Sequence, residues 1–340
     1  MNSRTAITNR RYALLLVSFI CGSALLFLVS WWWGESKISV MAFFRCLLQN
    51  DVEAQRIRRI VVNIRLARVL FASLVGAMLA FAGALMQSIL CNKLASPYTL
   101  GISSSAGFGA ALAIISNVSI LHGTFSVMGN AFIFSCLSVA LIYAIILKAG
   151  ISKGNIILAG MAINFLFSSA NTLLQYFAAP DAAYQVMFWT TGTLSRASYT
   201  NIVLLSVVFL ASCICISPIS RDIGIVMVDE GYAYSIGINV AVVRIISLTV
   251  VSILSACTVT VVGVIGFVGL VAPQMARLLG VAEPRRLFPL SACIGSFLLI
   301  LADLISRKLI QPTVLPIGAI TALIGIPFLV SMIVVCGEDM

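Results

Sequence analysis

The charged residues best placed to carry chemistry inside an apolar segment are Asp303 and Arg307. A carboxylate or a guanidinium within a membrane is costly and commonly marks an ion pathway or a proton relay. The two residues are four positions apart, so on a helix they share one face and can form an ion pair. We favour this structural pair over a direct role in transport, which the sequence leaves open.

The remaining residues do not assemble into a catalytic or metal-binding set. The nine cysteines form no CxxC pair, and the single histidine, His122, falls in a predicted loop. No GxxxxGK[ST] phosphate-binding loop occurs in the sequence. We therefore expect no enzymatic activity, no cofactor and no bound metal. Any ATP that drives this protein must be hydrolysed by another polypeptide.

The composition indicates that lipid surrounds most of the chain. Of its 340 residues, 61% are hydrophobic and only 9% are charged, and the mean hydropathy is +1.11. One crossing of a bilayer needs roughly 20 apolar residues, so the chain can hold about ten crossings. We predict an all-α polytopic membrane protein in which residues 1–340 form one transmembrane domain. The predicted helices span residues 12–33, 66–90, 98–116, 125–147, 156–178, 200–217, 244–263, 265–280, 287–306 and 316–336.

Small residues recur at helical spacing in several of these segments. One set is Gly76, Ala80 and Gly83, and another is Gly263, Gly266 and Gly269. Small faces let two helices approach closely in lipid, where there is no hydrophobic drive for association. The second set superficially resembles a nucleotide-binding loop, but its apolar surroundings favour helix packing.

The distribution of basic residues predicts the topology and excludes a nucleic-acid partner. The 21 lysines and arginines are scattered between apolar runs, unlike the basic face of a nucleic-acid-binding protein. Arg4, Arg10 and Arg11 favour a cytoplasmic start, and an even number of crossings returns the C-terminus to the cytoplasm. The first outer loop, residues 34–68, then holds an unusual basic cluster. Its members are Lys37, Arg45, Arg56, Arg58, Arg59, Arg65 and Arg68. Either this topology is wrong or the cluster meets an acidic partner, and we favour the partner.

The longest predicted cytoplasmic connection, residues 218–243, has mixed polarity. It contains Asp229 and Glu230 amid valine, isoleucine and methionine. Such a composition suits short helices that lie against a soluble partner. A solvated linker is the alternative that the composition leaves open.

A series of short motifs runs in a fixed order from about residue 60 to residue 335. In the first half the motifs are Arg65-Leu-Ala-Arg68, Leu74-Val-Gly-Ala77, Ala82-Gly-Ala-Leu-Met-Gln87, Asn92-Lys-Leu-Ala-Ser-Pro97 and Leu100-Gly-Ile-Ser-Ser104. In the second half they are Leu158-Ala-Gly160, Trp189-Thr-Thr-Gly-Thr-Leu194, Ile265-Gly-Phe-Val-Gly-Leu270, Leu301-Ala-Asp303, Leu315-Pro-Ile-Gly318 and Thr321-Ala-Leu-Ile-Gly325. Taken together, the series resembles the FecCD family of permeases, which serve ABC importers of ferric siderophores and cobalamin.

The resemblance implies a type II ABC importer permease of the bacterial inner membrane that works by alternating access between two permease subunits. The implied partners are cytoplasmic ATPase subunits and a periplasmic or lipid-anchored substrate-binding protein. The favoured substrate is an iron-siderophore or a similar metal chelate, while cobalamin, haem or an oxyanion stays open, as does a homodimer or a heterodimer of permeases. An ATP-independent secondary transporter is the less favoured alternative, because such proteins usually carry mid-membrane carboxylates that this sequence lacks.

The resemblance also implies roles for individual residues. The implied contacts to the binding protein, at the outer face, are Arg65, Arg68 and Arg307. The implied ATPase-coupling residues, within the 218–243 connection, are Asp229, Glu230, Ala233 and Gly237. The implied inner gate comprises Asn92, Leu94, Ser152 and Asn155. The sequence departs from the family at Lys93, where proline is usual, and at Gln274, where histidine is usual.

Overall fold

The chain folds into helices and connecting turns in a computed structural model that describes residues 8–32, 51–120, 126–310 and 313–336. Arg4, Lys37, Arg45 and His122 lie outside the described residues. In chain order the elements are α1 (Asn9–Trp32), α3 (Val52–Arg58), the π-helical segment η1 (Arg59–Leu66), α4 (Ala67–Leu90), the 3-10 turn η2 (Pro97–Leu100), α5 (Ile102–Ser116), α6 (Ser126–Ala149), α7 (Lys153–Tyr176), α8 (Pro180–Thr190), α9 (Tyr199–Val228), α10 (Glu230–Ser235), α11 (Val240–Val262), α12 (Val268–Leu278), α13 (Pro284–Lys308) and α14 (Ile317–Cys336).

Seven helical spans of the described residues are long and apolar enough to cross a membrane, and α5 and α14 are shorter apolar helices. The predicted all-α polytopic fold is therefore confirmed. Each of the ten predicted segments contains a helix, although α12 has only 11 residues and rises about 16 Å, roughly half a bilayer core.

Several predicted boundaries differ from the structure, and the short helix α8 was not predicted. The helix expected to begin at residue 66 begins at Val52, because α3, η1 and α4 form one continuous helix of 39 residues. The helix expected to end at residue 217 runs through Pro218 to Val228. Because α11 begins at Val240, the connection predicted over 218–243 is reduced to residues 229–239. The segment expected at 265–280 is helical only from Val268 to Leu278.

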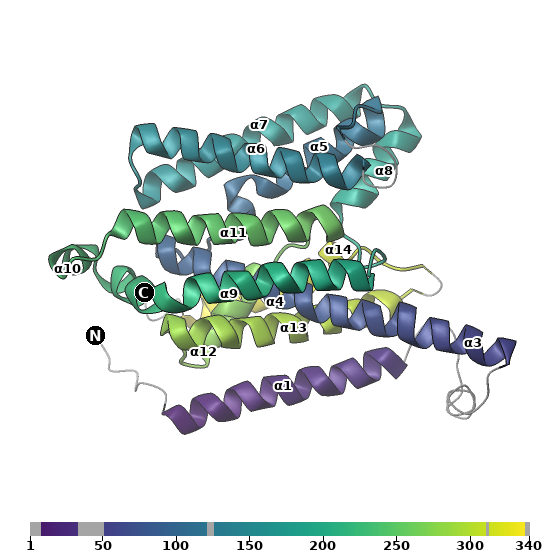
Figure 1. Cartoon of the computed structure of the whole chain (residues 1–340), viewed down its shortest axis with the longest axis horizontal. Coiled ribbons are helices and arrows are strands. Elements are labelled where there is room, and N and C mark those ends of the chain that lie inside the picture. Colours follow the sequence, from purple (N-terminus) through teal and green to yellow (C-terminus); the bar gives the residue numbers. More distant parts are fainter. Residues whose placement is uncertain (1–7, 33–50, 121–125, 311–312, 337–340) are drawn as a thin grey trace.

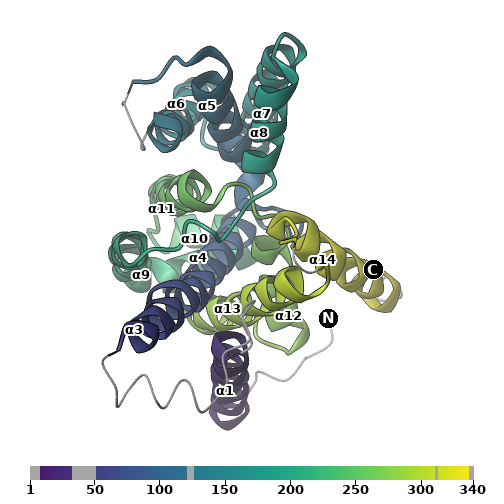
Figure 2. The same cartoon turned by 90° about the vertical axis from the view of Figure 1, so that its right-hand side faces the viewer.

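Figure 1 shows that α4 and α13 lie at the centre of the larger part of the molecule, with α1 on one outer side. Helices α5 to α8 form a separate group on the other side, and α11 lies between this group and α9 (Figures 1 and 2). The start of α1 and the end of α14 lie at the same end of the bundle as α10. We refer to this as the α10 end, and to the opposite end, where α3 protrudes, as the α3 end.

Glycines set the close approach of α4 to its neighbours. A methyl group on Gly83 would overlap the carbonyl oxygen of Gly269 in α12, and one on Gly76 would overlap the carbonyl oxygen of Gly295 in α13. The predicted packing role of Gly76, Gly83 and Gly269 is thus confirmed. Gly266 differs, because a methyl group there would meet no neighbouring atom within 4 Å.

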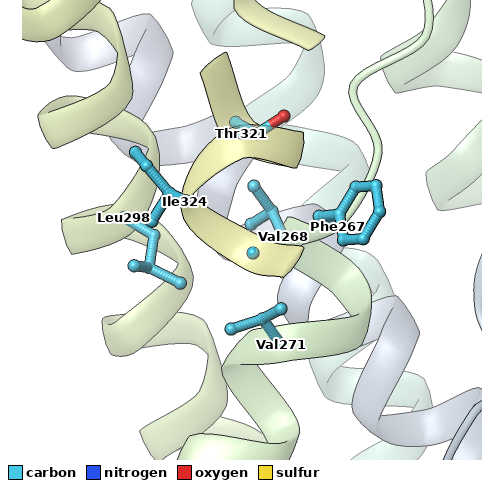
Figure 3. Close-up of a pocket in the computed structure, with 7 residues that line it drawn as sticks. Phe267, Val268, Val271, Leu298, Thr321 and Ile324 are labelled. Carbon is cyan, nitrogen blue, oxygen red and sulfur yellow. The ribbon is translucent and has the colours of Figure 1, made fainter. Parts of the chain in front are cut away.

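The last helix, α14, packs across a tight apolar seam. Ile324 and Thr321 of α14 line a small space together with Val268 and Val271 of α12 and Leu298 of α13 (Figure 3). The space between them is about 10 Å³, which is close to the minimum for one water molecule. This seam is a packing contact and offers no room for a ligand.

Candidate functional site

At the α3 end, one carboxylate joins two of the predicted docking arginines. Asp303 of α13 is fully buried, and its Oδ2 atom lies 2.8 Å from Nη2 of Arg307, so the predicted i,i+4 ion pair is confirmed. Its Oδ1 atom accepts a hydrogen bond of 2.9 Å from Nε of Arg68 in α4. Asp303 therefore balances charge from two helices, which the spacing along one helix could not reveal.

The other contacts of these arginines lead to α1. Arg65, in the π-helical segment, donates to the backbone carbonyl of Trp32 at 2.9 Å, and Arg307 donates to the hydroxyl of Ser30. Only 6% of Arg65 and 4% of Arg307 is exposed. These contacts fix the end of α1 on the bundle, and they leave little of either guanidinium at the surface of the single chain.

The π-helical segment that carries Arg65 is held by two further side chains. Trp31 of α1 donates to the carbonyl of Val61 at 3.1 Å, and Tyr199 of α9 donates to the carbonyl of Val62 at 2.7 Å. A π-turn widens the helix and often occurs at functional sites. Exposed arginines at the start of this segment and in α3 extend the positive charge of this end; they are Arg56, Arg58 and Arg59.

At the α10 end, the predicted coupling residues form one compact turn. The side chain of Asp229 caps α10 by accepting from the backbone N–H groups of Gly231 at 2.7 Å and Tyr232 at 3.2 Å. Ala233 is fully buried and packs with Val226 and Val240. Gly237 leaves the turn with φ of +84°, a conformation that favours glycine. The turn is thus fixed at its start, middle and end.

Glu230 connects this turn to the start of α7. Its Oε1 atom lies 2.6 Å from Nζ of Lys153 and 2.6 Å from Nη2 of Arg244. Arg244 is buried in α11 and also donates to the carbonyl of Ile151 at 3.2 Å. We call Glu230, Lys153 and Arg244 the ionic triad. The sequence predicted a role for Glu230 but not its two partners, which belong to the helices α7 and α11.

The triad also sets the ionisation of Glu230. Partial burial acts to raise the pKa of its carboxyl group, but the hydrogen bonds and positive charges of Lys153 and Arg244 outweigh this effect. The net result is a pKa below the ordinary value of 4.5. The carboxylate is therefore charged at neutral pH, as the ion pairs require.

The predicted gate residues lie in two turns at the same end. Ser152 caps α7 by accepting from the N–H of Asn155 at 3.1 Å, and Asn155 donates to the carbonyl of Ala149 at 2.8 Å. In the other turn, Asn92 accepts from the N–H of Leu94 at 2.9 Å, and Leu94 is 62% exposed. Lys153, of the ionic triad, follows Ser152 directly. The structure therefore brings one gate turn into contact with the coupling turn.

The two departures from the family pattern meet beside the other gate turn. The side-chain amide of Gln274 in α12 donates to the carbonyl of Lys93 at 2.5 Å and to Oε1 of Gln87 at 3.1 Å. Gln87 also accepts from Arg277 and donates to the carbonyl of Leu270 at 3.2 Å. Gln87 and Arg277 were not predicted to hold this turn, because hydropathy does not indicate which buried polar groups meet.

Comparison with known proteins places this arrangement in a family. Residues 4–335 match the FecCD transport family. The hemin transport system permease protein of Yersinia pestis is 33% identical over 314 residues, which cover 92% of this chain and 94% of that protein. The vitamin B12 import system permease protein of Vibrio cholerae is 31% identical over 325 residues, which cover 96% of this chain and 94% of that protein.

A solved structure agrees with these relatives. A metal-chelate type ABC transporter in an inward-facing conformation superimposes with a TM-score of 0.83 at 28% identity, covering 94% of this chain and 99% of that chain. The resemblance drawn from the motifs is thereby confirmed in both sequence and fold. The chain belongs to the FecCD transport family and is the non-catalytic, multi-pass permease of an ABC importer.

Proposed function

We propose that this permease moves an iron-siderophore or a similar metal chelate across the bacterial inner membrane, with both chain termini in the cytoplasm. Two permease subunits, identical or homologous, enclose the path. A loaded binding protein delivers the substrate at the α3 end, and two ATPase subunits act at the α10 end. ATP binding and hydrolysis switch the path between its outward and inward openings by alternating access.

The ionic triad is the observation that carries this proposal. An ATPase that moves the α10 turn also moves Glu230. Glu230 forms an ion pair with Lys153, the first residue of α7, so the movement is passed on to α7. The turn also presents a soluble partner with apolar side chains, since Tyr232, Tyr234 and Ile236 are 59%, 60% and 47% exposed. An exposed apolar cluster of this kind favours a protein contact.

The gate role of Asn92, Leu94, Ser152 and Asn155 rests on the same contacts. Both turns lie at the α10 end, and Leu94 exposes most of its side chain there. In the proposal, pulling α7 through Lys153 opens or closes the path at the Ser152–Asn155 turn. The side-chain amide of Gln274 donates a hydrogen bond to the carbonyl of Lys93 and so stabilises the Asn92–Leu94 turn.

The α3 end is the proposed docking surface for the binding protein. Arg65, Arg68 and Arg307 lie at this end, and the exposed arginines of α3 and η1 continue the positive charge outward. An acidic protein is the partner that such a surface fits, because opposite charges steer and orient an encounter. Because Arg65 and Arg307 are buried, the exposed arginines that the described part of this end offers to a partner are Arg56, Arg58 and Arg59.

Uptake into vesicles tests the function. Vesicles would hold the permease, its ATPase and its binding protein, and would be offered radiolabelled iron-siderophores, haem and vitamin B12 in turn. We expect ATP-dependent uptake of an iron chelate that needs all three components. Uptake of haem or vitamin B12 alone would identify the substrate as that compound, whereas uptake without ATP would support a secondary transporter.

Charge reversal tests the docking surface. In the double variant Arg58→Glu/Arg59→Glu, we expect the KM for loaded binding protein to rise about ten-fold, while assembly with the ATPase is retained. The matched control is Lys148→Glu, which changes an exposed charge at the α10 end. An unchanged KM in the double variant would contradict docking at the α3 end.

A further inference from the structure

A groove runs between α9 and α13, away from the ionic triad and the gate turns. Its apolar section has a volume of about 630 Å³ and is floored by Phe81 of α4. A second section of about 590 Å³ continues toward α10 and shares Ser220 and Arg285 with the first. We call the two sections together the α9–α13 groove. Each section has the size of a site for a small organic molecule.

The apolar section is built to receive hydrocarbon. Phe81 meets Phe209 edge-on with ring centres 5.7 Å apart and meets Phe288 at 5.5 Å. Cys213, Ile216 and Ser217 of α9 and Pro289 and Ala292 of α13 also line this section. Helices α9 and α13 are both membrane-spanning in length and composition, so this section lies at the depth of lipid chains.

The cations of the groove lie toward its α10 end. Arg285, at the first turn of α13, borders both sections, and Arg221 of α9 borders the second. Both are exposed, and among the described residues neither forms an ion pair within 4.0 Å. Glu283 also borders the second section, but its carboxylate is paired with Arg286 at 3.3 Å. The net charge offered to a ligand is therefore positive.

The distance between the apolar section and the arginines Arg221 and Arg285 suits a ligand with a hydrocarbon chain at one end and a negative charge at the other. Arg221 follows Cys213 by eight residues, which is about 12 Å along a helix, so the guanidinium stands well beyond the aromatic floor. The positive end of the α13 dipole adds to the charge of Arg285. Basic pockets between membrane helices are a recognised way of binding anionic lipid head groups.

We propose that the α9–α13 groove binds an anionic phospholipid. One acyl chain lies along Phe81, Phe209 and Phe288, and the phosphate meets Arg285 and Arg221. The second section is also bordered by Val228 and Tyr232, on either side of Asp229. If the proposed function of the α10 turn holds, a bound lipid stiffens the α9–α10 junction through which the ATPase acts.

Native mass spectrometry of the purified full-length chain tests the site with two lipids of the same acyl chains, phosphatidylglycerol and phosphatidylcholine. We expect phosphatidylglycerol to bind the natural chain more tightly. Arg285→Gln should weaken phosphatidylglycerol binding about five-fold, and Arg221→Gln/Arg285→Gln about 25-fold, since each basic residue near a membrane surface contributes about 1 kcal/mol. Phosphatidylcholine binding should not change in either variant.

Two further variants distinguish the parts of the site. Ala292→Phe fills the apolar section and should weaken the binding of both lipids. Lys148→Gln removes an exposed charge at the same end but outside the groove, and should weaken neither. Melting temperatures confirm that each variant is folded, and phosphatidylglycerol should raise that of the natural chain but not that of the double arginine variant.

Three results would overturn the proposal. The first is equal phosphatidylglycerol binding by the natural chain and the double arginine variant. The second is unchanged lipid binding by Ala292→Phe. The third is full displacement of phosphatidylglycerol by millimolar inorganic phosphate, which would indicate a site for a free anion. None of these measurements depends on transport, so failure here and failure of the proposed function are distinguishable.

Discussion

The Oε1 atom of Glu230 lies 2.6 Å from Nζ of Lys153, so the first residue of α10 is joined directly to the first residue of α7. The same oxygen contacts Arg244, which reaches the carbonyl of Ile151 in the turn before α7. The α10 turn and the Ser152–Asn155 turn, for which we propose coupling and gating roles, are therefore connected through a single carboxylate. Displacing α10 relative to α7 and α11 would break both charged contacts of Glu230.

Replacing Glu230 by glutamine should uncouple transport from ATP. The change keeps the size of the side chain but removes its charge, which weakens both contacts of the triad. We expect uptake per assembled complex to fall about five-fold or more, as for the loss of about 1 kcal/mol of coupling free energy. ATP-dependent uptake in vesicles measures this. The control is Glu283→Gln, which removes an exposed carboxylate paired only with Arg286 among the ion pairs of the described chain. Equal uptake by both variants would contradict the role of the triad.

Acidification should remove the contribution of Glu230 to stability. The pKa of Glu230 is lower in the folded chain than its ordinary value of 4.5, so its stabilising effect is complete above pH 4.5 and is lost as the pH falls through the folded value. The melting temperatures of the natural chain and of Glu230→Gln should therefore differ at pH 7 and converge below pH 4.5. A difference that stays constant down to pH 3.5 would show that the charge of Glu230 does not stabilise the fold.

Asp303→Asn should destabilise the α3 end strongly. The variant leaves Arg68 and Arg307 without the carboxylate that balances them, and Arg307 is only 4% exposed. Breaking a buried ion pair by removing one partner costs about 3–5 kcal/mol. Thermal unfolding in detergent measures the loss, with Asp222→Asn, a change of one partly exposed carboxylate, as the control. A natural melting temperature in Asp303→Asn would mean that the two arginines are balanced by other groups.

Gly83→Ala should disturb the contact between α4 and α12. The added methyl group would overlap the backbone of Gly269, which cannot rotate away as a side chain could. Overpacking of this kind costs about 1–3 kcal/mol or more. Gly154→Ala is the matched control, because a methyl group there meets nothing within 4 Å and alanine is the better helix former. Equal melting temperatures for the two variants would contradict the close packing.

Hydropathy predicted most of the membrane-spanning helices because apolar length is a local property. Hydropathy did not predict α3, because Arg56, Arg58 and Arg59 make that part of the long helix polar. A polar stretch between apolar segments favours the prediction of a loop. The prediction also ended α9 too early because Pro218 usually stops a helix, whereas within a membrane protein neighbouring helices and side chains can satisfy the freed backbone groups. Helix α8 is short and begins with Pro180 and Asp181, so it too resembles a loop.

The motifs identified the regions of the candidate site but not its contacts. The predicted helix 244–263 begins at Arg244, but nothing in the sequence indicated that this side chain is buried and pairs with Glu230. Likewise, the sequence suggested that the arginines of the α3 end form a surface cluster. In the structure Arg68 and Arg307 pair with Asp303, and Arg65 donates to the carbonyl of Trp32 in α1. Apart from the i,i+4 pair of Asp303 and Arg307, these contacts join residues of different helices, and a pattern along one helix carries no information about them.

The π-helical segment between α3 and α4 sets the direction in which the side chains of α3 point relative to those of α4. A π-turn holds one residue more than an α-turn, so converting one such turn to α-helix would rotate α3 by about 100° about its own axis relative to α4. The carbonyls of Val61 and Val62, which accept from Trp31 and Tyr199, hold the present setting. Such a rotation would change the direction in which Arg56, Arg58 and Arg59 point. The ion pair between Arg68 and Asp303 lies in α4 and α13 and would be unaffected. The exposed arginines of the α3 end could then change their orientation while α4 keeps its packing against α12 and α13.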